Sequence, residues 1–195
     1  MTLILMARHS ETNWNAERRV QGQSGASLNA KGISQARELG QLLRLNANVS
    51  AIVVSTLARA LETGLIVAEA LKLPRIYSDP RLLECSFGSL EGKPLTEVDE
   101  LCDRYFADDG SYITYDYSRW GGEARQEVLA RLNQCLGDVE DFFGKSASVI
   151  LIGHSHAFCT LLVANSLAPE RIKRQGIFSS YILKNARLHQ LPIRR

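Results

Sequence analysis

Two histidines in this chain each follow a short apolar run, and their positions are the first sign of chemistry. Arg8 and His9 come soon after residues 3–6, and His154 comes soon after residues 149–152. Such runs predict buried strands. In parallel sheets that helices cover on both faces, ligands bind at the carboxyl ends of the strands. Both histidines are therefore expected to contribute to one binding site.

A third apolar run, residues 52–54, leads to Arg59 and adds a second arginine to this set. Two arginines and two histidines suit a doubly charged anion, and phosphate matches them well because arginine binds its oxygens in pairs. A neutral imidazole can attack phosphorus, which divides phosphoryl transfer into two steps. The charges of Arg8 and Arg59 would lower the pKa of His9 and keep its imidazole neutral. The expected site binds a phosphoryl group and contains a nucleophile for it.

The elements that must position these residues alternate between strands and helices. Strands are predicted at residues 3–6, 51–54, 75–78 and 149–152, and helices at 33–43, 57–71, 123–143 and 158–167. Residues 181–183 and 188–191 are typical of a terminal hairpin that adds an antiparallel edge. The alternation predicts an α/β fold, a three-layer α/β/α sandwich with a mostly parallel central sheet.

A length of 195 residues favours a single domain, residues 1–195, with one buried core. Residues 10–29 are polar and are predicted to form a long ordered loop, a kind of segment that often carries function. Residues 95–120 begin like a helix and then become rich in tyrosine and aspartate. They are a candidate cap over the strand ends.

Composition limits the classes of partner. A net charge of +2 gives no reason to expect nucleic acid or a membrane surface as a partner. The four cysteines are scattered, so free thiols in a reducing compartment are expected rather than disulfides or a zinc site. The first apolar run is too short for a signal peptide or a membrane span. A cytoplasmic location is therefore expected, and a homodimer stays open.

The residues around His9 also match a known family pattern. Residues 8–15, Arg-His-Ser-Glu-Thr-Asn-Trp-Asn, resemble the signature of the histidine phosphatase superfamily in its phosphoglycerate mutase-like branch. Further segments agree in order along nearly the whole chain, at residues 19–23, 28–36, 55–63, 81–92, 121–123 and 153–155. The resemblance implies the phosphoglycerate mutase-like version of the predicted sandwich.

The resemblance implies a role for each candidate residue. His9 would be the nucleophile that becomes phosphorylated, and Glu84 the general acid that protonates the leaving oxygen and then activates water. No metal and no cofactor is needed, because phosphoryl transfer depends mainly on positioning and charge. The candidate site residues are His9, Glu84 and His154 for catalysis, and Arg8, Asn15, Gln21, Gly22, Arg59 and His154 for binding phosphate.

Several of these residues could have a simpler structural role instead. Asn15 could be a turn residue, and Gln21 and Gly22 could shape the loop. Arg59 could form a surface ion pair with Glu62 in the next turn of its helix. Glu84 competes with other acids for the role of proton donor, namely Glu62, Glu91 and Glu123.

Two serines depart from the family pattern, which usually has glycine at both positions. Ser10 follows the nucleophile, and Ser155 follows the second histidine. A left-handed backbone at Ser10 would be strained. His154 and His156 have the spacing of two metal ligands, but without a third ligand we expect no metal there. His156 is expected either behind the residues that contact the substrate or at the rim of the pocket.

These observations favour a phosphatase that hydrolyses a small phosphorylated substrate through a phosphohistidine at His9. The chain lacks a long insertion of the kind that mutases use to enclose a bisphosphorylated substrate, so hydrolysis is favoured over a cofactor-dependent phosphoglycerate mutase. A non-catalytic phospholigand-binding protein is the third alternative. Such a protein would not need both a nucleophile and an acid.

Overall fold

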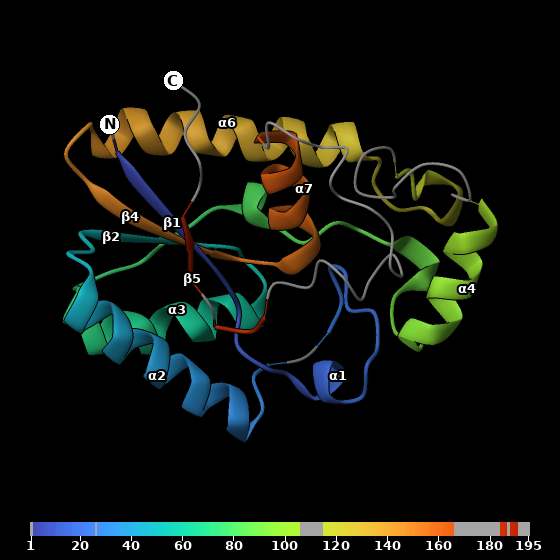
Figure 1. Ribbon diagram of the computed structural model, residues 1–195, viewed down its shortest axis with the longest axis horizontal. Helices are drawn as coiled ribbons and strands as arrows, with labels where there is room; N and C mark the ends of the chain where they lie inside the picture. Colours follow the sequence, from blue (N-terminus) through green and yellow to red (C-terminus); the bar gives the residue numbers. More distant parts are fainter. Residues whose placement is uncertain (1, 26, 106–114, 166–183, 187, 191–195) are drawn as a thin grey trace.

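A five-stranded sheet with the order β3-β2-β4-β1-β5 forms the centre of the computed structural model (Figure 1). The structure describes residues 2–25, 27–105, 115–165, 184–186 and 188–190. The parallel strands are β1 (Leu3–Arg8), β2 (Ala51–Val54), β3 (Tyr77–Ser78) and β4 (Ser148–Gly153). β5 (Leu188–Gln190) pairs antiparallel with β1. The predicted α/β fold with a mostly parallel sheet is confirmed, and so is its antiparallel edge.

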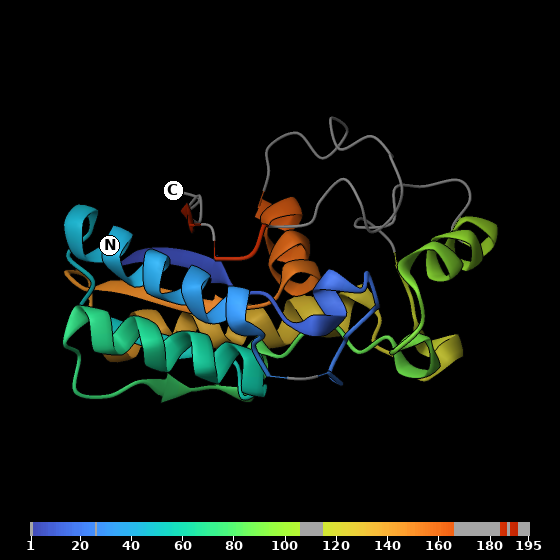
Figure 2. The ribbon, with the colours of Figure 1, turned by 90° about the horizontal axis from the view of Figure 1, so that it is seen from below.

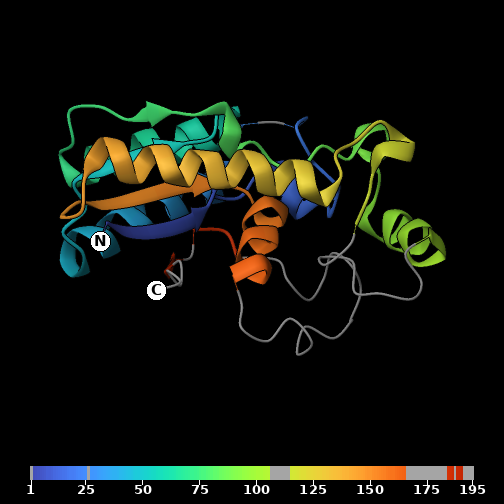
Figure 3. The same cartoon turned by 90° about the horizontal axis from the view of Figure 1, so that it is seen from above.

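Helices cover both faces of the sheet, as the views from below and above show (Figures 2 and 3). α2 (Ala30–Asn46) and α3 (Ala58–Leu71) lie on one side, and α6 (Arg125–Phe143) and α7 (Ser155–Asn165) pack on the other. A strand that is buried on both faces must be apolar at every position, not only at alternate ones. This explains why the segments of β1, β2 and β4 contain continuous apolar runs and do not alternate between apolar and polar residues.

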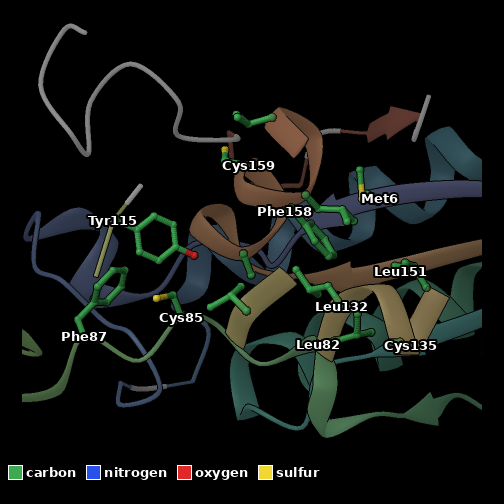
Figure 4. Close-up of a cluster of buried hydrophobic side chains, with 14 of the residues drawn as sticks. Met6, Leu82, Cys85, Phe87, Tyr115, Leu132, Cys135, Leu151, Phe158 and Cys159 are labelled. Atoms are coloured by element: carbon green, nitrogen blue, oxygen red, sulfur yellow. The ribbon is translucent and has the colours of Figure 1, made fainter. Parts of the chain in front are cut away.

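Alternate residues of β4 enter two separate hydrophobic clusters. Ile150 and Ile152 pack with the side chains of α2 and α3, whereas Val149 and Leu151 pack with those of α6 and α7. Figure 4 shows the second cluster, with Leu132 of α6 and Phe158 of α7 among its labelled members. The two clusters together hold the helices against the two faces of the sheet.

The observed element boundaries differ from the predicted ones at several points. The predicted polar loop contains a short helix, α1 (Asn13–Ala16), whose N-cap is Thr12. α7 begins at Ser155, three residues before the predicted start, because its first turn binds a side chain from elsewhere in the chain and is not marked by apolar periodicity. The predicted strand at residues 75–78 is shortened to β3, and the hairpin residues 181–183 lie outside the described residues.

The candidate cap is described only in part. α4 (Leu95–Tyr105) lies at one end of the molecule (Figure 1), and a 3-10 helix, η3 (Ser118–Trp120), precedes α6. Tyr115 and Tyr117 are buried in the cluster of α6 and α7, so these aromatic rings form core. Residues 106–114 lie outside the described part, and the cap function stays a prediction.

All four cysteines are free thiols and are buried, as expected (Cys85, Cys102, Cys135 and Cys159). None of the helices in the described part of the chain combines the length and the apolar character that a membrane crossing requires. Within the same residues, no three His, Cys, Asp or Glu side chains come together where they could hold a metal ion.

The contact between α2 and the loop after β1 predicts the effect of a small substitution. A Cβ atom on Gly32 would lie 2.1 Å from the carbonyl oxygen of Glu11, so Gly32→Ala must displace main chain. We expect it to lower the free energy of unfolding by about 1–3 kcal/mol, as overpacked sites do. Gly137→Ala in α6 is the matched control: a Cβ there meets nothing within 4 Å. It should raise stability by about 0.5–1 kcal/mol. Urea unfolding would measure both, and equal effects would contradict the prediction.

Candidate active site

A cavity of about 330 Å³ lies at the carboxyl ends of β1 and β4. Seven of the eight candidate residues line it: Arg8, His9, Asn15, Gln21, Gly22, Arg59 and Glu84. They come from the end of β1, the loop after it, the first turn of α3 and the segment before α4. The structure thus brings together residues that are up to about seventy-five positions apart in the sequence.

Two hydrogen bonds define the state of His9. Its Nδ1 lies 2.7 Å from the carbonyl oxygen of Ser10, and its Nε2 lies 3.2 Å from Nε of Arg59. A carbonyl oxygen only accepts and a guanidinium only donates, so Nδ1 carries the hydrogen and Nε2 carries the lone pair. The ring is therefore neutral, and its nucleophilic nitrogen points toward the buried arginine.

The pKa of His9 is held well below its usual value of 6.5. Burial is the largest cause, followed by the positive charges of Arg59 and Arg8, while the bond to the carbonyl of Ser10 acts in the opposite direction. The sequence had suggested the two arginines but not the larger contribution of burial. At neutral pH the imidazole is consequently ready to act as a nucleophile without first losing a proton.

Arg59 is buried, and its guanidinium ties the loop after β1 to the first turn of α3. Its two terminal nitrogens donate to the carbonyl oxygens of Ser24 at 2.7 Å and Gly22 at 2.6 Å. The alternative of a surface pair with Glu62 is wrong, because Glu62 instead accepts a bond from the backbone nitrogen of Leu28. Burial lowers the pKa of Arg59 to about 10, so the side chain remains a cation at neutral pH.

The loop that receives Arg59 is held by the carboxylate of Glu91. This carboxylate accepts hydrogen bonds from the backbone nitrogens of Gln23, Ser24 and Phe87, at 3.1, 2.9 and 3.1 Å. Gly22 has a φ of +54°, and a Cβ on it would lie 2.1 Å from Oε1 of Glu91. Glycine is required here for both reasons, so Gly22 has a clear part in shaping the loop.

Asn15 and Gln21 are both bonded to Thr12. The side-chain oxygen of Asn15 accepts from the backbone nitrogen of Thr12, and the hydroxyl of Thr12 donates to Oε1 of Gln21 at 3.0 Å. These contacts use the amide oxygens. Both residues line the cavity, and an amide nitrogen is a hydrogen-bond donor.

The carboxylate of Glu84 lies against the first turn of α7. Its Oε1 accepts from the backbone nitrogens of Cys85 at 3.0 Å and Ala157 at 2.8 Å, and its Oε2 accepts from that of His156 at 3.1 Å. The first backbone nitrogens of a helix have no partner within the helix and favour an anion. Of the four competing acids, Glu62, Glu84, Glu91 and Glu123, only Glu84 lines the cavity.

His154 is the one candidate residue that does not line the cavity. Its ring centroid lies 5.2 Å from that of His9, and its Nε2 lies 2.8 Å from the hydroxyl oxygen of Ser55. Its pKa is also lowered, first by burial and then by Arg59. Its Nδ1 is buried without a hydrogen-bond partner among the described residues. The structure places His154 beside His9, and direct contact with phosphate stays a prediction.

Comparison with known proteins agrees with this arrangement. A sequence model of the histidine phosphatase superfamily (branch 1) matches residues 4–186. The chain belongs to this superfamily. It is 38% identical over 140 residues to a probable phosphoglycerate mutase GpmB from Enterobacter sp. (strain 638), an alignment that covers 71% of this chain and 63% of the relative. The chain therefore spans somewhat less than two thirds of that relative's length.

Solved structures share the histidine phosphatase fold. YhfR of Bacillus stearothermophilus has a TM-score of 0.76 and 29% identity, with 96% of this chain and 89% of that chain covered. A mycobacterial glucosyl-3-phosphoglycerate phosphatase has a TM-score of 0.77 over 97% and 92% of the two chains. Its 24% identity makes it evidence for the fold alone.

The two serines that depart from the histidine phosphatase pattern fit without strain. Ser10 is not among the residues with a positive φ, and its backbone nitrogen donates to the hydroxyl of Thr63 at 3.0 Å. Ser155 is the first residue of α7 and lines the cavity. His156 also lines the cavity, in agreement with its predicted place at the rim, and its ring packs edge-on against Phe87 and Tyr115.

Sequence analysis did not select several residues that line this histidine phosphatase cavity, among them Arg18, Leu95 and Asn185. Arg18 lines it with a φ of +55°, and Leu95 lines it from the start of α4. Asn185 also lines it, and its amide donates to the carbonyl oxygen of His9 at 2.8 Å. Arg18 could have been suspected as a cation within the polar loop. No local signal marks Asn185, because only the pairing of β5 with β1 brings its segment to the site.

The loop geometry predicts that Gly22→Ala impairs catalysis more than folding. The added Cβ would displace Glu91 and shift the carbonyl that binds Arg59, so we expect kcat/KM to fall by about tenfold or more. Gly121→Ala is the control: Gly121 also has a positive φ, +75°, but its Cβ would meet nothing within 4 Å. The control should lose stability and keep its kinetics. Steady-state assays with p-nitrophenyl phosphate would decide, and a Gly22→Ala enzyme within twofold of wild type would contradict the prediction.

Three buried neutral histidines predict a loss of stability in mild acid. The pKa values of His9 and His154 are lowered, and burial lowers that of His156 to about 3. Below about pH 6.5 the unfolded chain binds protons that the folded chain does not, so the free energy of unfolding falls as the pH falls. Each histidine contributes a slope of up to about 1.4 kcal/mol per pH unit.

This slope can be measured by urea unfolding at several values between about pH 7 and pH 5. His156→Phe replaces one of the three rings with another aromatic ring and should reduce the slope by about a third, whatever its effect on stability at neutral pH. If His156→Phe showed the same dependence of the free energy of unfolding on pH as wild type, His156 would not contribute to the loss of stability in acid.

Proposed function

We propose that this protein is a metal-independent phosphatase that hydrolyses small phosphomonoesters through a phosphohistidine on His9. One observation carries the proposal: the lone pair of His9 Nε2 faces the buried Arg59 in a cavity that Glu84 also lines. A neutral nucleophile, a fixed cation and a carboxyl group within one small cavity are the parts that a two-step phosphoryl transfer needs.

In the first step, Nε2 of His9 attacks phosphorus and the bond to the leaving oxygen breaks. The protonated carboxyl of Glu84 gives its proton to that oxygen, so the product leaves as an alcohol. Arg59, which donates to Nε2 in the free enzyme, would transfer this hydrogen bond to a phosphoryl oxygen. Arg8 supplies a second positive charge at the same cavity.

In the second step, the Glu84 carboxylate takes a proton from water, and the oxygen of that water attacks phosphorus. The bond between phosphorus and Nε2 breaks, and inorganic phosphate leaves. The electron pair of that bond returns to Nε2, so His9 regains the neutral form that its two hydrogen bonds favour. The amides of Asn15 and Gln21 would donate to phosphoryl oxygens in both steps.

A cofactor-dependent phosphoglycerate mutase is the second candidate, because the curated relative named above is described as a probable phosphoglycerate mutase. Both reactions would share the phosphohistidine and differ in what receives the phosphoryl group. The lack of a long insertion supports hydrolysis, since water can then reach the intermediate. Under this proposal the enzyme acts in the cytoplasm as one domain, with residues 95–120 as its cap.

A trapping experiment tests the proposed intermediate. Brief mixing with ³²P-labelled phosphomonoester followed by alkaline quenching should leave label on His9, stable in base and lost in acid. His9→Ala should show neither label nor turnover. Turnover by His9→Ala at the wild-type rate would refute the proposed nucleophile, and a wild-type protein inactive on a broad panel would favour a non-catalytic binding protein.

A product assay separates the two candidate reactions. The phosphatase should release inorganic phosphate steadily from several small phosphomonoesters, with no requirement for an added cofactor. The mutase would instead interconvert 2- and 3-phosphoglycerate, respond to 2,3-bisphosphoglycerate and release little phosphate. Measuring phosphate release and isomerisation in the same samples decides between them.

A further inference from the structure

Arg131 of α6 uses its whole guanidinium to hold the backbone around Glu84. Its Nη1 donates to the carbonyl oxygens of Arg81 and Leu83, both at 2.7 Å, and its Nη2 donates to that of Glu84 at 3.1 Å. Nε and Nη2 also bind the two carboxylate oxygens of Glu123, at 2.9 and 3.0 Å. These bonds occupy all five of the donors that an arginine has.

Glu123 extends the same network to the other side of Glu84. Its Oε2 accepts from the backbone nitrogen of Ser86 at 2.8 Å, and its own backbone nitrogen donates to the carbonyl oxygen of Ser86 at 2.9 Å. The amide of Gln23 donates to the carbonyl oxygen of Glu84 at 3.1 Å. The main chain is therefore bound immediately before, at and after Glu84.

This segment has no other regular structure to hold it. It runs between two short 3-10 helices, η1 (Pro80–Leu82) and η2 (Gly88–Leu90), and pairs with no strand among the described residues. The core anchors it from one side, where Leu82, Cys85 and Phe87 are buried (Figure 4). Backbone carbonyls away from a sheet or helix need other donors, and Arg131 supplies three such bonds.

The two sets of contacts confine Glu84 from opposite ends. Its carboxylate is bound by backbone nitrogens of Cys85 and of the first turn of α7, and its carbonyl oxygen is bound by Arg131. Proton transfer requires the carboxyl oxygen to lie within hydrogen-bond reach of the leaving oxygen, and small displacements are costly. Loss of the contacts at the main chain would let the carboxyl group move away from the leaving oxygen.

We infer that Arg131, paired with Glu123, is a positioning residue for proton transfer by Glu84. The inference rests on the proposed function, in which Glu84 protonates the leaving oxygen. Arg81 has no such role: its side chain binds Asp79 and Asp138, and only its carbonyl oxygen belongs to the network.

The inference predicts an effect that depends on the leaving group. An alkoxide needs a proton to leave, whereas 2,4-dinitrophenolate leaves readily without one. Arg131→Gln should lower kcat/KM for an alkyl phosphate such as glycerol 3-phosphate by about 100-fold. It should change kcat/KM for 2,4-dinitrophenyl phosphate by less than about threefold, because kcat/KM reports only the first step, whereas the second step, in which Glu84 activates water, is the same for both substrates.

Three further variants make the test specific. Glu84→Gln removes the acid itself and should show the same preference for the activated substrate. In the double variant, which carries both Arg131→Gln and Glu84→Gln, the loss of kcat/KM on glycerol 3-phosphate should be smaller than the product of the two single losses, because both changes affect the same step. Arg81→Ala is the matched control, since it removes an arginine from the same region together with its ion pairs to Asp79 and Asp138. It should lower the melting temperature and affect both substrates equally.

Equal losses of kcat/KM for Arg131→Gln on the two substrates, or a wild-type kcat/KM on glycerol 3-phosphate, would overturn the inference while Glu84→Gln still discriminates between the substrates. If Glu84→Gln itself fails to discriminate, the proposed role of Glu84 is refuted, and the inference about Arg131 falls with it. Arg131→Lys keeps the charge but cannot make the five bonds, and it serves the same test if Arg131→Gln does not fold. Melting temperatures of all variants would be measured alongside the kinetics.

Discussion

The buried hydrogen bond from Arg59 to His9 is the interaction on which the rest of the site depends, because the structure around it must supply acceptors and negative charge for the guanidinium. Burying a cation is costly unless its donors are satisfied. Here the two terminal nitrogens bind the carbonyl oxygens of Gly22 and Ser24, and the negative charges of Glu84 and Glu91 favour the charged form. The same guanidinium keeps the neighbouring imidazole neutral. The loop after β1 therefore supplies the acceptors that allow Arg59 to be buried next to His9.

Carboxylates that bind backbone nitrogens recur throughout this site. Glu91 closes the loop over Arg59, Glu123 holds Ser86, and Glu84 binds the first turn of α7. Each joins segments that are distant in the sequence, so each stabilises the site in the same way. What distinguishes Glu84 is its location, since it alone of the three borders the cavity. The residue type therefore makes all three glutamates candidates for the proton donor, and only their positions relative to the cavity distinguish them.

Several features could be predicted from the sequence because they depend on local pattern. The continuous apolar runs indicated β1, β2 and β4, since strands buried on both faces must be apolar throughout. Arg8, His9 and Arg59 were placed at one site because parallel strands end at the same edge of the sheet. Resemblance to a family then extended the site to Glu84 and to the loop residues, which all border the observed cavity.

Other features depend on contacts between distant segments, and only the tertiary structure decided them. The first turn of α7 binds Glu84, seventy-odd residues earlier in the sequence, and Asn185 reaches His9 through the pairing of β5 with β1. The tautomer of His9 and the place of His154 beside it, not in the cavity wall, follow from partners on other elements. Residue type and spacing are local properties of the chain, whereas the direction of a buried polar side chain depends on which donors and acceptors packing brings within reach. The sequence by itself therefore determined the buried parallel strands, the family and the residue types at the candidate site, and the packing of the helices on the sheet decided which groups meet.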